Sequence, residues 1–332
     1  MLILLQLVLL VAGLVLLIKG ADYLVDGSSA IAKIFKVPTI LIGLTIVSFG
    51  TSAPELLTSL TSVVQGSSEI SLGNIIGSNI TNILLILGMA AIINPLNLKS
   101  NTVWKEIPLA ILAALAMILF ALRSTVNAGT FTLLRDNLAN PELTVGFIDR
   151  ADGVTLLLFF AVFMYYAFSL SKKGLGEDFE IPEISMTKAA GVTLLGAAGL
   201  GLGSNLLVTN AIELASTLNI DEGLVGLTIV AFGTSLPELA ATVAAAKKKE
   251  ADLAVGNIIG SNIFNTLFVL GITAVTVPLT IDSRTLVDAL IMLVVTIVLF
   301  IASHFFGYRR ITKTEGYIML TGYFCYFAYL LY

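Results

Sequence analysis

The stretch that decides the fold occurs twice in the chain. It reads GLTIVSFGTSAPELLTSL at residues 43–60 and GLTIVAFGTSLPELAATV at 226–243, with 12 of 18 positions identical. A second block, LGNIIGSNITNILLILG at 72–88, recurs as VGNIIGSNIFNTLFVLG at 255–271, with 12 of 17 positions identical. Both pairs are separated by 183 residues, so one internal duplication explains them.

The composition places these blocks in a membrane protein. Of the 332 residues, 57% are hydrophobic and 12% are charged, with a mean hydropathy of +0.98. Soluble proteins carry about a quarter charged residues. Apolar stretches of roughly 20 residues, enough to cross a bilayer as a helix, recur along nearly the whole chain, and the alternation of a membrane barrel is absent. We predict ten spans, at about residues 1–20, 38–64, 71–95, 104–122, 151–171, 187–217, 223–246, 251–280, 284–304 and 315–332.

The loop charges predict the orientation of these spans. Cytoplasmic loops of membrane proteins carry an excess of Lys and Arg. With the N-terminus outside, the ten spans place 14 of the 18 basic residues on the cytoplasmic side. We therefore expect a multi-pass protein of the plasma (inner) membrane with both termini extracytoplasmic. No basic tract supports a nucleic-acid partner.

The duplication predicts an inverted repeat. Each copy carries five spans, and because five is odd the second copy enters the membrane from the opposite side, as in many secondary transporters. The predicted fold is an all-α polytopic membrane protein with ten transmembrane helices in two inverted five-helix repeats. The first repeat covers 1–172 with its motifs at 43–88, a cytoplasmic linker covers 173–187, and the second repeat covers 188–332 with its motifs at 226–271.

Each GTSxPE motif predicts a break in a transmembrane helix. Pro54 and Pro237 lack the amide hydrogen that would bond to the carbonyl four residues earlier, which belongs to Gly50 or Gly233. Irregular backbone at membrane depth is tolerated only where it faces protein or a water-filled cavity. We expect the freed carbonyls to bind a cation.

The motifs also place oxygen-bearing side chains on single helix faces. Glu55 and Glu238 follow Thr51 and Thr234 by four residues, so hydroxyl and carboxylate lie one turn apart. The second block repeats this spacing in two further pairs, Ser78 with Asn82 and Ser261 with Asn265. Inverted symmetry is expected to bring these four oxygen-bearing helix faces together near the middle of the membrane.

This set of oxygens predicts a site for a hard cation. With one cysteine and one histidine, the chain offers no soft-metal site. Ca²⁺ takes about six to eight oxygen ligands. An unpaired carboxylate at the bilayer centre costs about 2.5–3.5 kcal/mol on insertion scales, so the two glutamates need a counterion. One Ca²⁺, two or more Na⁺ or two H⁺ would each supply the charge, which gives a physical basis for exchange.

The repeated motifs resemble the α-repeats of the cation/Ca²⁺ exchanger superfamily, specifically its prokaryotic sodium/calcium exchanger-like branch. GTSAPE and GTSLPE, each followed by GNIIGSN, carry the resemblance twice and in the same order. It implies antiport by alternating access, in which the first and sixth spans slide past the remaining helices. Ca²⁺ and Na⁺ are then the transported ions; we expect no cofactor and a protein that functions as a monomer.

The resemblance also implies residue roles. Glu55, Glu238, Thr51 and Thr234 would form the central Ca²⁺ site, which Asn82 and Asn265 would complete. One Na⁺ site would use Ser52, Ser261 and the Ala231 carbonyl. The other would use Ser235, Ser78 and the Ser48 carbonyl. One branch of the family has aspartate at the position of Asn265, so this chain differs from that branch by one carboxylate.

Two other functions remain open at this point. A Ca²⁺/H⁺ antiporter would share the fold and both glutamates, with protons in place of Na⁺. A cation channel is a weaker alternative, because channels usually build pores by rotational symmetry. An enzyme is not expected, since the sequence contains no HExxH motif and no nucleophile with a histidine base.

Overall fold

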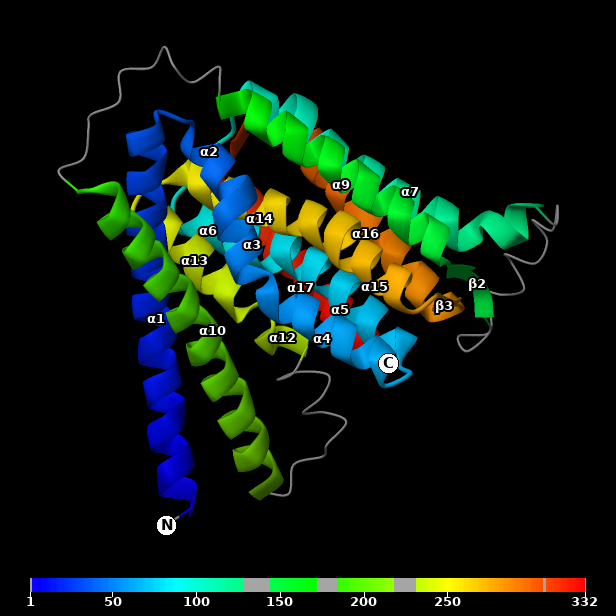
Figure 1. Cartoon of the computed structure of the whole chain (residues 1–332), viewed down its shortest axis with the longest axis horizontal. Coiled ribbons are helices and arrows are strands. Elements are labelled where there is room, and N and C mark those ends of the chain that lie inside the picture. Colours follow the sequence, from blue (N-terminus) through cyan, green and yellow to red (C-terminus); the bar gives the residue numbers. More distant parts are fainter. Residues whose placement is uncertain (1, 128–143, 172–183, 218–230, 307–308, 332) are drawn as a thin grey trace.

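The structure is a computed structural model that describes residues 2–127, 144–171, 184–217, 231–306 and 309–331 (Figure 1). It is predominantly helical. The first half contains α1 (Leu2–Phe35), α2 (Thr39–Ile42), η1 (Gly43–Val47), α3 (Ser48–Thr51), α4 (Ala53–Val64), α5 (Ser68–Thr81), η2 (Asn82–Leu87), α6 (Gly88–Ile93), η3 (Thr102–Glu106), α7 (Ile107–Asn127) and α9 (Arg150–Ser171). The second contains α10 (Met186–Thr217), α12 (Ala231–Gly233), α13 (Leu236–Lys247), α14 (Ala251–Ile263), η6 (Phe264–Val269), α15 (Leu270–Thr276), α16 (Ser283–Ile301), η7 (Ala302–Phe306) and α17 (Lys313–Leu331).

Seven helices of the described residues are long and apolar enough to cross a membrane. They cover Leu4–Phe35, Ser68–Ile93, Thr102–Arg123, Arg150–Ser169, Met186–Leu214, Ala251–Thr276 and Ser283–His304. An eighth span is formed by Thr39–Thr51 and Ala53–Val64, if this bent pair counts as one. The other two predicted spans correspond to α17 and to a segment whose residues 223–230 lie outside the described part. The count of ten stays a prediction.

Two central spans form the core of the bundle. Of their most apolar windows, 78% is buried in Ser68–Ile93 and 83% in Ala251–Thr276, against 28–44% in the other five long helices. Both contain the GNIIGSN block, and both pass into a π-helical segment at its end, η2 and η6. The second repeated block therefore lies at the centre of the bundle.

Helices α1 and α10 form a long pair at one side of the bundle (Figure 1). Glycines allow this close approach: a Cβ on Gly20 would lie 2.9 Å from the Gly196 carbonyl oxygen, and one on Gly13 would lie 3.0 Å from that of Gly203. Gly196 and Gly203 follow Gly13 and Gly20 by 183 residues. The internal repeat therefore relates the Gly20–Gly196 contact to the Gly13–Gly203 contact. Small residues are the usual means of close packing between membrane helices.

Within the described residues, four short strands form two antiparallel pairs that the all-helical prediction missed. β1 (Leu96–Asn97) pairs with β4 (Arg310–Ile311), and β2 (Thr144–Ile148) pairs with β3 (Leu279–Asp282). Strands of two to five residues are too short to show an alternating pattern in sequence. The prediction also ended the first span at residue 20, whereas α1 continues until Lys36 adopts a left-handed φ of 54° before Pro38.

Candidate functional site

The predicted breaks at both GTSxPE motifs are confirmed. Ser52 separates α3 from α4 with φ −86° and ψ 9°, and Ser235 precedes α13 with φ −84° and ψ 3°. Pro54 and Pro237 each stand in the first turn of the following helix, where the missing amide hydrogen is not needed. At the first break the two helical pieces are bent by 45°.

The carbonyls around the breaks have different partners. The Gly233 carbonyl, freed by Pro237, accepts a hydrogen bond from the Ser204 hydroxyl of α10 at 2.8 Å. The Ser48 carbonyl still accepts the Ser52 amide at 2.9 Å. The Thr51 hydroxyl lies 3.4 Å from the same oxygen, so an Na⁺ there would compete with two donors. The predicted role of Ser48 stays a prediction, as does that of the Ala231 carbonyl at the start of α12.

Glu55 and Glu238 are both fully buried. The Ser78 hydroxyl donates to Glu55 Oε1 and the Ser261 hydroxyl to Glu238 Oε1, each at 3.5 Å. Ser52 donates to Glu238 Oε1 across the repeats at 2.8 Å. The two carboxyl groups are close enough to act on each other electrostatically. The carboxyl group of each repeat thus meets hydroxyls of the central helices.

Two asparagines that the sequence analysis did not select hold the glutamate turns in place. Asn74 donates to the Glu55 carbonyl at 3.1 Å, and its oxygen accepts the Thr234 hydroxyl of the other repeat at 3.2 Å. Asn257 donates to the Glu238 carbonyl at 3.5 Å and accepts the Thr51 hydroxyl at 3.1 Å. Each is the first asparagine of GNIIGSN, a repeated polar position that could have identified them.

Four further asparagines form a reciprocal network at the centre. Asn79 and Asn262 each donate to the other's carbonyl, at 3.5 and 3.2 Å. Asn82 donates to the Asn262 side-chain oxygen at 3.0 Å, and Asn265 donates to the Asn79 side-chain oxygen at 3.3 Å. The internal repeat also relates these bonds in pairs, because Asn262 and Asn265 follow Asn79 and Asn82 by 183 residues. The sequence analysis selected Asn82 and Asn265 but not the other two, which join the two central helices.

Four oxygens in this region are buried and have no hydrogen-bond partner among the described residues. They are Oε2 of Glu55 and Glu238 and the side-chain oxygens of Asn82 and Asn265. An unpaired buried oxygen costs free energy unless a donor or a cation satisfies it. The described residues contain no group of three or more His, Cys, Asp and Glu side chains that could hold a metal. A cation here would be bound by two carboxyl groups and neutral oxygens.

The structure thus brings together most of the predicted site residues. Glu55, Glu238, Ser52, Ser78, Ser261, Asn82 and Asn265 share the contacts above, and Ser235 donates to the Ser78 hydroxyl at 3.3 Å. The hydroxyls of Thr51 and Thr234 are directed to Asn257 and Asn74. No hydrogen bond within the described part of the chain joins either threonine hydroxyl to the glutamate of its own turn.

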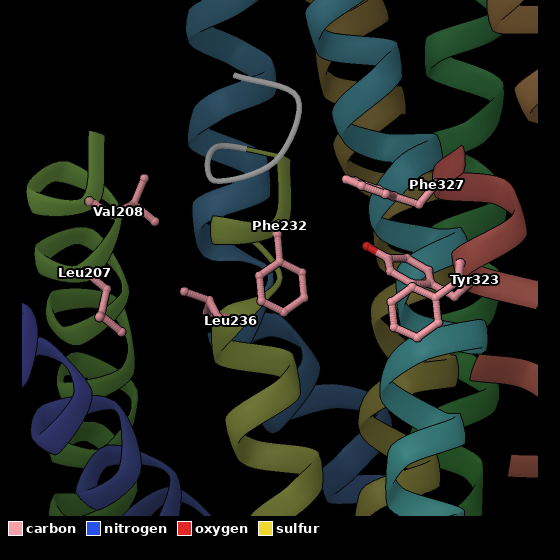
Figure 2. A pocket seen from close by; sticks show the side chains of 8 residues that line it. Leu207, Val208, Phe232, Leu236, Tyr323 and Phe327 are labelled. Atoms are coloured by element: carbon pink, nitrogen blue, oxygen red, sulfur yellow. The ribbon is translucent and has the colours of Figure 1, made fainter. Parts of the chain in front are cut away.

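Apolar pockets flank both breaks without reaching the carboxyl groups. One of about 390 Å³ lies between α10 and α17; in Figure 2, Phe232 and Leu236 lie between Leu207 on one side and Tyr323 on the other. A larger one of about 840 Å³ is lined by α1, the first break and α9. Leu24 and Phe49 of the larger pocket are the 183-residue counterparts of Leu207 and Phe232. These pockets belong to the apolar surroundings of the breaks.

Comparisons with known proteins identify the family. A family model described as "Sodium/calcium exchanger protein" matches residues 5–169 and 188–332. The chain is 40% identical to "Putative antiporter CaxA" of Alkalimonas amylolytica over 98% of both chains, and 31% identical to "Sodium/calcium exchanger MaX1" of Methanosarcina acetivorans over 98% of both. A solved structure of the sodium-calcium exchanger NCX_Mj superimposes with a TM-score of 0.81 at 30% identity, over 98% of this chain and 99% of that one. The resemblance inferred from the motifs is confirmed, and the chain is an integral, multi-pass membrane protein that belongs to the sodium/calcium exchanger family.

Proposed function

We propose that the chain exchanges Ca²⁺ for Na⁺ across the membrane by alternating access, with Ca²⁺ bound between Glu55 and Glu238. The family is one of transporters that exchange cations for Ca²⁺, and no enzymatic activity is proposed. The observation that carries the proposal is the pair of fully buried glutamates, each with one buried oxygen that no described residue satisfies. A divalent cation would neutralise both groups at once.

The proposed Ca²⁺ ligands surround this pair. Asn82 and Asn265 each supply a side-chain oxygen that is likewise unsatisfied among the described residues. Thr51 and Thr234 would add their hydroxyl oxygens, because a hydroxyl that donates to an asparagine still has lone pairs for a cation. Six side chains then offer enough oxygens for a cation that takes about six to eight.

The proposed Na⁺ sites lie on either side of the Ca²⁺ site. Ser52 and Ser261 share Oε1 of Glu238 as their acceptor, which supports one site that the Ala231 carbonyl would complete. Ser235 and Ser78 are hydrogen-bonded at 3.3 Å, which supports the second, with the Ser48 carbonyl. More than two Na⁺ in place of one Ca²⁺ would make each cycle move net charge.

The proposed architecture is ten spans in two inverted repeats, divided at 1–172, 173–187 and 188–332. It is supported by bonds that exchange under the 183-residue offset at both the asparagine network and the α1–α10 glycines. The α1–α10 pair would slide past the core as one unit. We further propose that the protein lies in the plasma membrane with both termini extracytoplasmic and functions as a monomer.

A Ca²⁺/H⁺ antiporter is the second candidate. It is favoured by the same unsatisfied glutamate oxygens, since a proton on each would also neutralise the pair. The purified chain in proteoliposomes distinguishes the two: Ca²⁺ uptake driven by a pH gradient without Na⁺ supports proton exchange. Uptake that requires an Na⁺ gradient supports sodium exchange, and saturation at carrier-like turnover excludes a channel.

The site itself is tested by Na⁺-gradient-driven ⁴⁵Ca²⁺ uptake in proteoliposomes with Glu55→Gln and Glu238→Gln. Each change removes one of the two charges that would balance Ca²⁺, and breaking a buried charge pair costs about 3–5 kcal/mol, so uptake is expected to fall roughly 100-fold or more. Glu69→Gln, at an exposed glutamate of α5, is the matched control and is expected to retain uptake. Wild-type uptake in both buried variants would overturn the proposed site.

A further inference from the structure

A third buried carboxyl group lies outside the repeated motifs. Glu106 ends the π-helical segment η3 and is fully buried. Its Oε1 accepts a hydrogen bond from the Tyr166 hydroxyl of α9 at 2.9 Å. Its Oε2 is buried without a hydrogen-bond partner among the described residues. The proposed exchange mechanism does not use this group.

The charges around Glu106 do not form an ion pair with it. Lys105 places its Nζ 5.7 Å from the centroid of the Tyr166 ring. Asp252 of α14 acts on Glu106 electrostatically and is itself paired with Lys99 at 2.9 Å. Among the described residues, no Lys or Arg nitrogen lies within salt-bridge distance of Glu106. If ionised, this group would be favoured by the hydroxyls of Tyr166 and Thr102 and by Lys105 at a distance, and opposed by Asp252 and by its burial.

Asp288 of α16 has a similar arrangement, although its side chain is only half-buried. It follows Glu106 by 182 residues, one fewer than the offset of the motifs. The Tyr326 hydroxyl of α17 hydrogen-bonds to it, and Arg284 and Asp282 are the charged groups that act on it. Its Oδ1 is buried with no partner in the described part of the chain. Each acid–tyrosine pair joins two neighbouring outer segments, η3 to α9 or α16 to α17.

The two acids lie at opposite ends of the helical bundle. η3 begins shortly after β1, which pairs with β4, whereas α16 begins directly after β3, which pairs with β2. The far end of α7 contacts β2, so the two strand pairs mark the two ends of this helix. One acid is therefore near each end of the membrane-spanning region.

We propose that Glu106 and Asp288 are two proton-binding sites separate from the ion site, each holding a proton on its unbonded oxygen. An ionised carboxylate without a partner in an apolar interior is costly, and such a group takes up a proton instead. Protonation of one oxygen leaves the other free to accept the tyrosine hydroxyl. A metal ion fits less well, because the carboxyl group and the hydroxyls of Thr102 and Tyr166 supply fewer oxygens than the six to eight that Ca²⁺ takes.

Infrared spectra of the full-length protein in lipid vesicles at neutral pH test this proposal. The carbonyl stretch of a protonated carboxyl group is separate from that of a carboxylate. Glu106→Gln and Asp288→Asn are each expected to remove one protonated-carboxyl band, whereas Glu69→Gln, at an exposed position, is expected to remove none. Spectra of both variants identical to wild type in this region would overturn the proposal.

Tyr166→Phe keeps the test decisive if a variant at Glu106 does not fold. It retains the carboxyl group and removes the hydrogen bond to Oε1, so the Glu106 band is expected at higher frequency. An unmoved band contradicts the assignment, and a band abolished by Ca²⁺ or Na⁺ assigns the group to a metal instead. Because Tyr166 lies outside the ion site, Na⁺-driven Ca²⁺ uptake is expected to stay within about twofold of wild type, which separates this proposal from that of the exchange function.

Discussion

The two GTSxPE breaks have nearly the same sequence but different hydrogen bonds. Glu238 accepts from Ser52 at 2.8 Å and from Ser261 at 3.5 Å. Glu55 accepts from Ser78 at 3.5 Å, and Ser235, the counterpart of Ser52, donates to Ser78 instead. The two copies of the duplicated motif thus form different hydrogen bonds in this conformation. In inverted-repeat transporters, alternating access comes from one repeat or bundle moving against the other around a fixed site.

The glycines of the second block pack α14 closely against the first break. On α14, a Cβ at Gly256 would lie 2.7 Å from the Ile40 carbonyl, and one at Gly260 would lie 2.7 Å from the Leu44 Cα. Their counterparts on α5, Gly73 and Gly77, have nothing within 4 Å among the described residues. The first break is packed tightly on the second-repeat helix, whereas the residues that would make the reverse contact, 223–230, lie outside the described part.

The largest expected difference is between Ser52→Ala and Ser235→Ala. Ser52→Ala removes the shorter bond to Glu238, and a hydrogen bond to a charged group contributes about 1.5–3 kcal/mol, so Na⁺-driven Ca²⁺ uptake is expected to fall about tenfold or more. Ser235→Ala removes a bond between two hydroxyls, with an expected loss of only a few fold. Equal losses in the proteoliposome assay would mean that this asymmetry has no functional consequence.

The next comparison is Gly256→Ala against Gly73→Ala. The new methyl group at 256 meets backbone atoms that cannot move aside, and overpacking costs about 1–3 kcal/mol, so the detergent-solubilised protein should unfold at lower temperature. Gly73 is exposed, with no described residue within 4 Å of an added methyl group, and alanine favours the helix over glycine by about 1 kcal/mol. A Gly73→Ala protein as unstable as Gly256→Ala would show that both faces are packed.

A smaller effect is expected at Ser204, which connects α10 to the second break only. Ser204→Ala leaves the Gly233 carbonyl without its donor and is expected to cost about 1 kcal/mol of stability. The equivalent residue in the first repeat is Ala21, which cannot form this bond. Thr217→Ala, at an exposed hydroxyl of the same helix, is the control. Equal unfolding temperatures of the two variants would mean that the bond from Ser204 to the Gly233 carbonyl adds no measurable stability.

The smallest effect concerns the ends of the outer helices. At the α7–α9 end, Asp149 accepts hydrogen bonds from the Asp152 amide and from Arg123, and these hold the pKa of Asp149 below its usual range. A lowered folded-state pKa stabilises the protein above the unfolded pKa of about 4, and this contribution is lost as pH falls through the folded value. The α16 end instead has Arg284 bonded to the Leu330 carbonyl.

Asp149→Asn is therefore expected to lower the unfolding temperature slightly at pH 7 and to have no effect at a pH below the lowered pKa. Thermal unfolding of both proteins at the two pH values measures the difference. A deficit that persists unchanged in acid would indicate that the side chain acts through packing or neutral hydrogen bonds, since its charge is removed there.

The sequence by itself determined the membrane class, most of the spans, the duplication and the two helix breaks. These features depend on local properties: runs of apolar residues long enough for a bilayer, and a proline that cannot donate a hydrogen bond. The motifs also identified the oxygen-bearing residues that the structure gathers around Glu55 and Glu238. These residues could be identified because their motifs occur twice, 183 residues apart.

Only the tertiary structure decided which of those oxygens meet. The bonds from Ser52 to Glu238 and from Thr234 to Asn74 join residues more than 150 positions apart, and no local pattern specifies such pairs. The same holds for Ser204 at the Gly233 carbonyl, a serine that occurs in one repeat only. Glu106 remained unnoticed because it has no repeated motif, and its hydrogen bond with Tyr166 results from the position of η3 beside α9. The sequence thus identifies which residues can contribute to the site. The hydrogen bonds that distinguish the two nearly identical motifs depend on the conformation of the whole bundle.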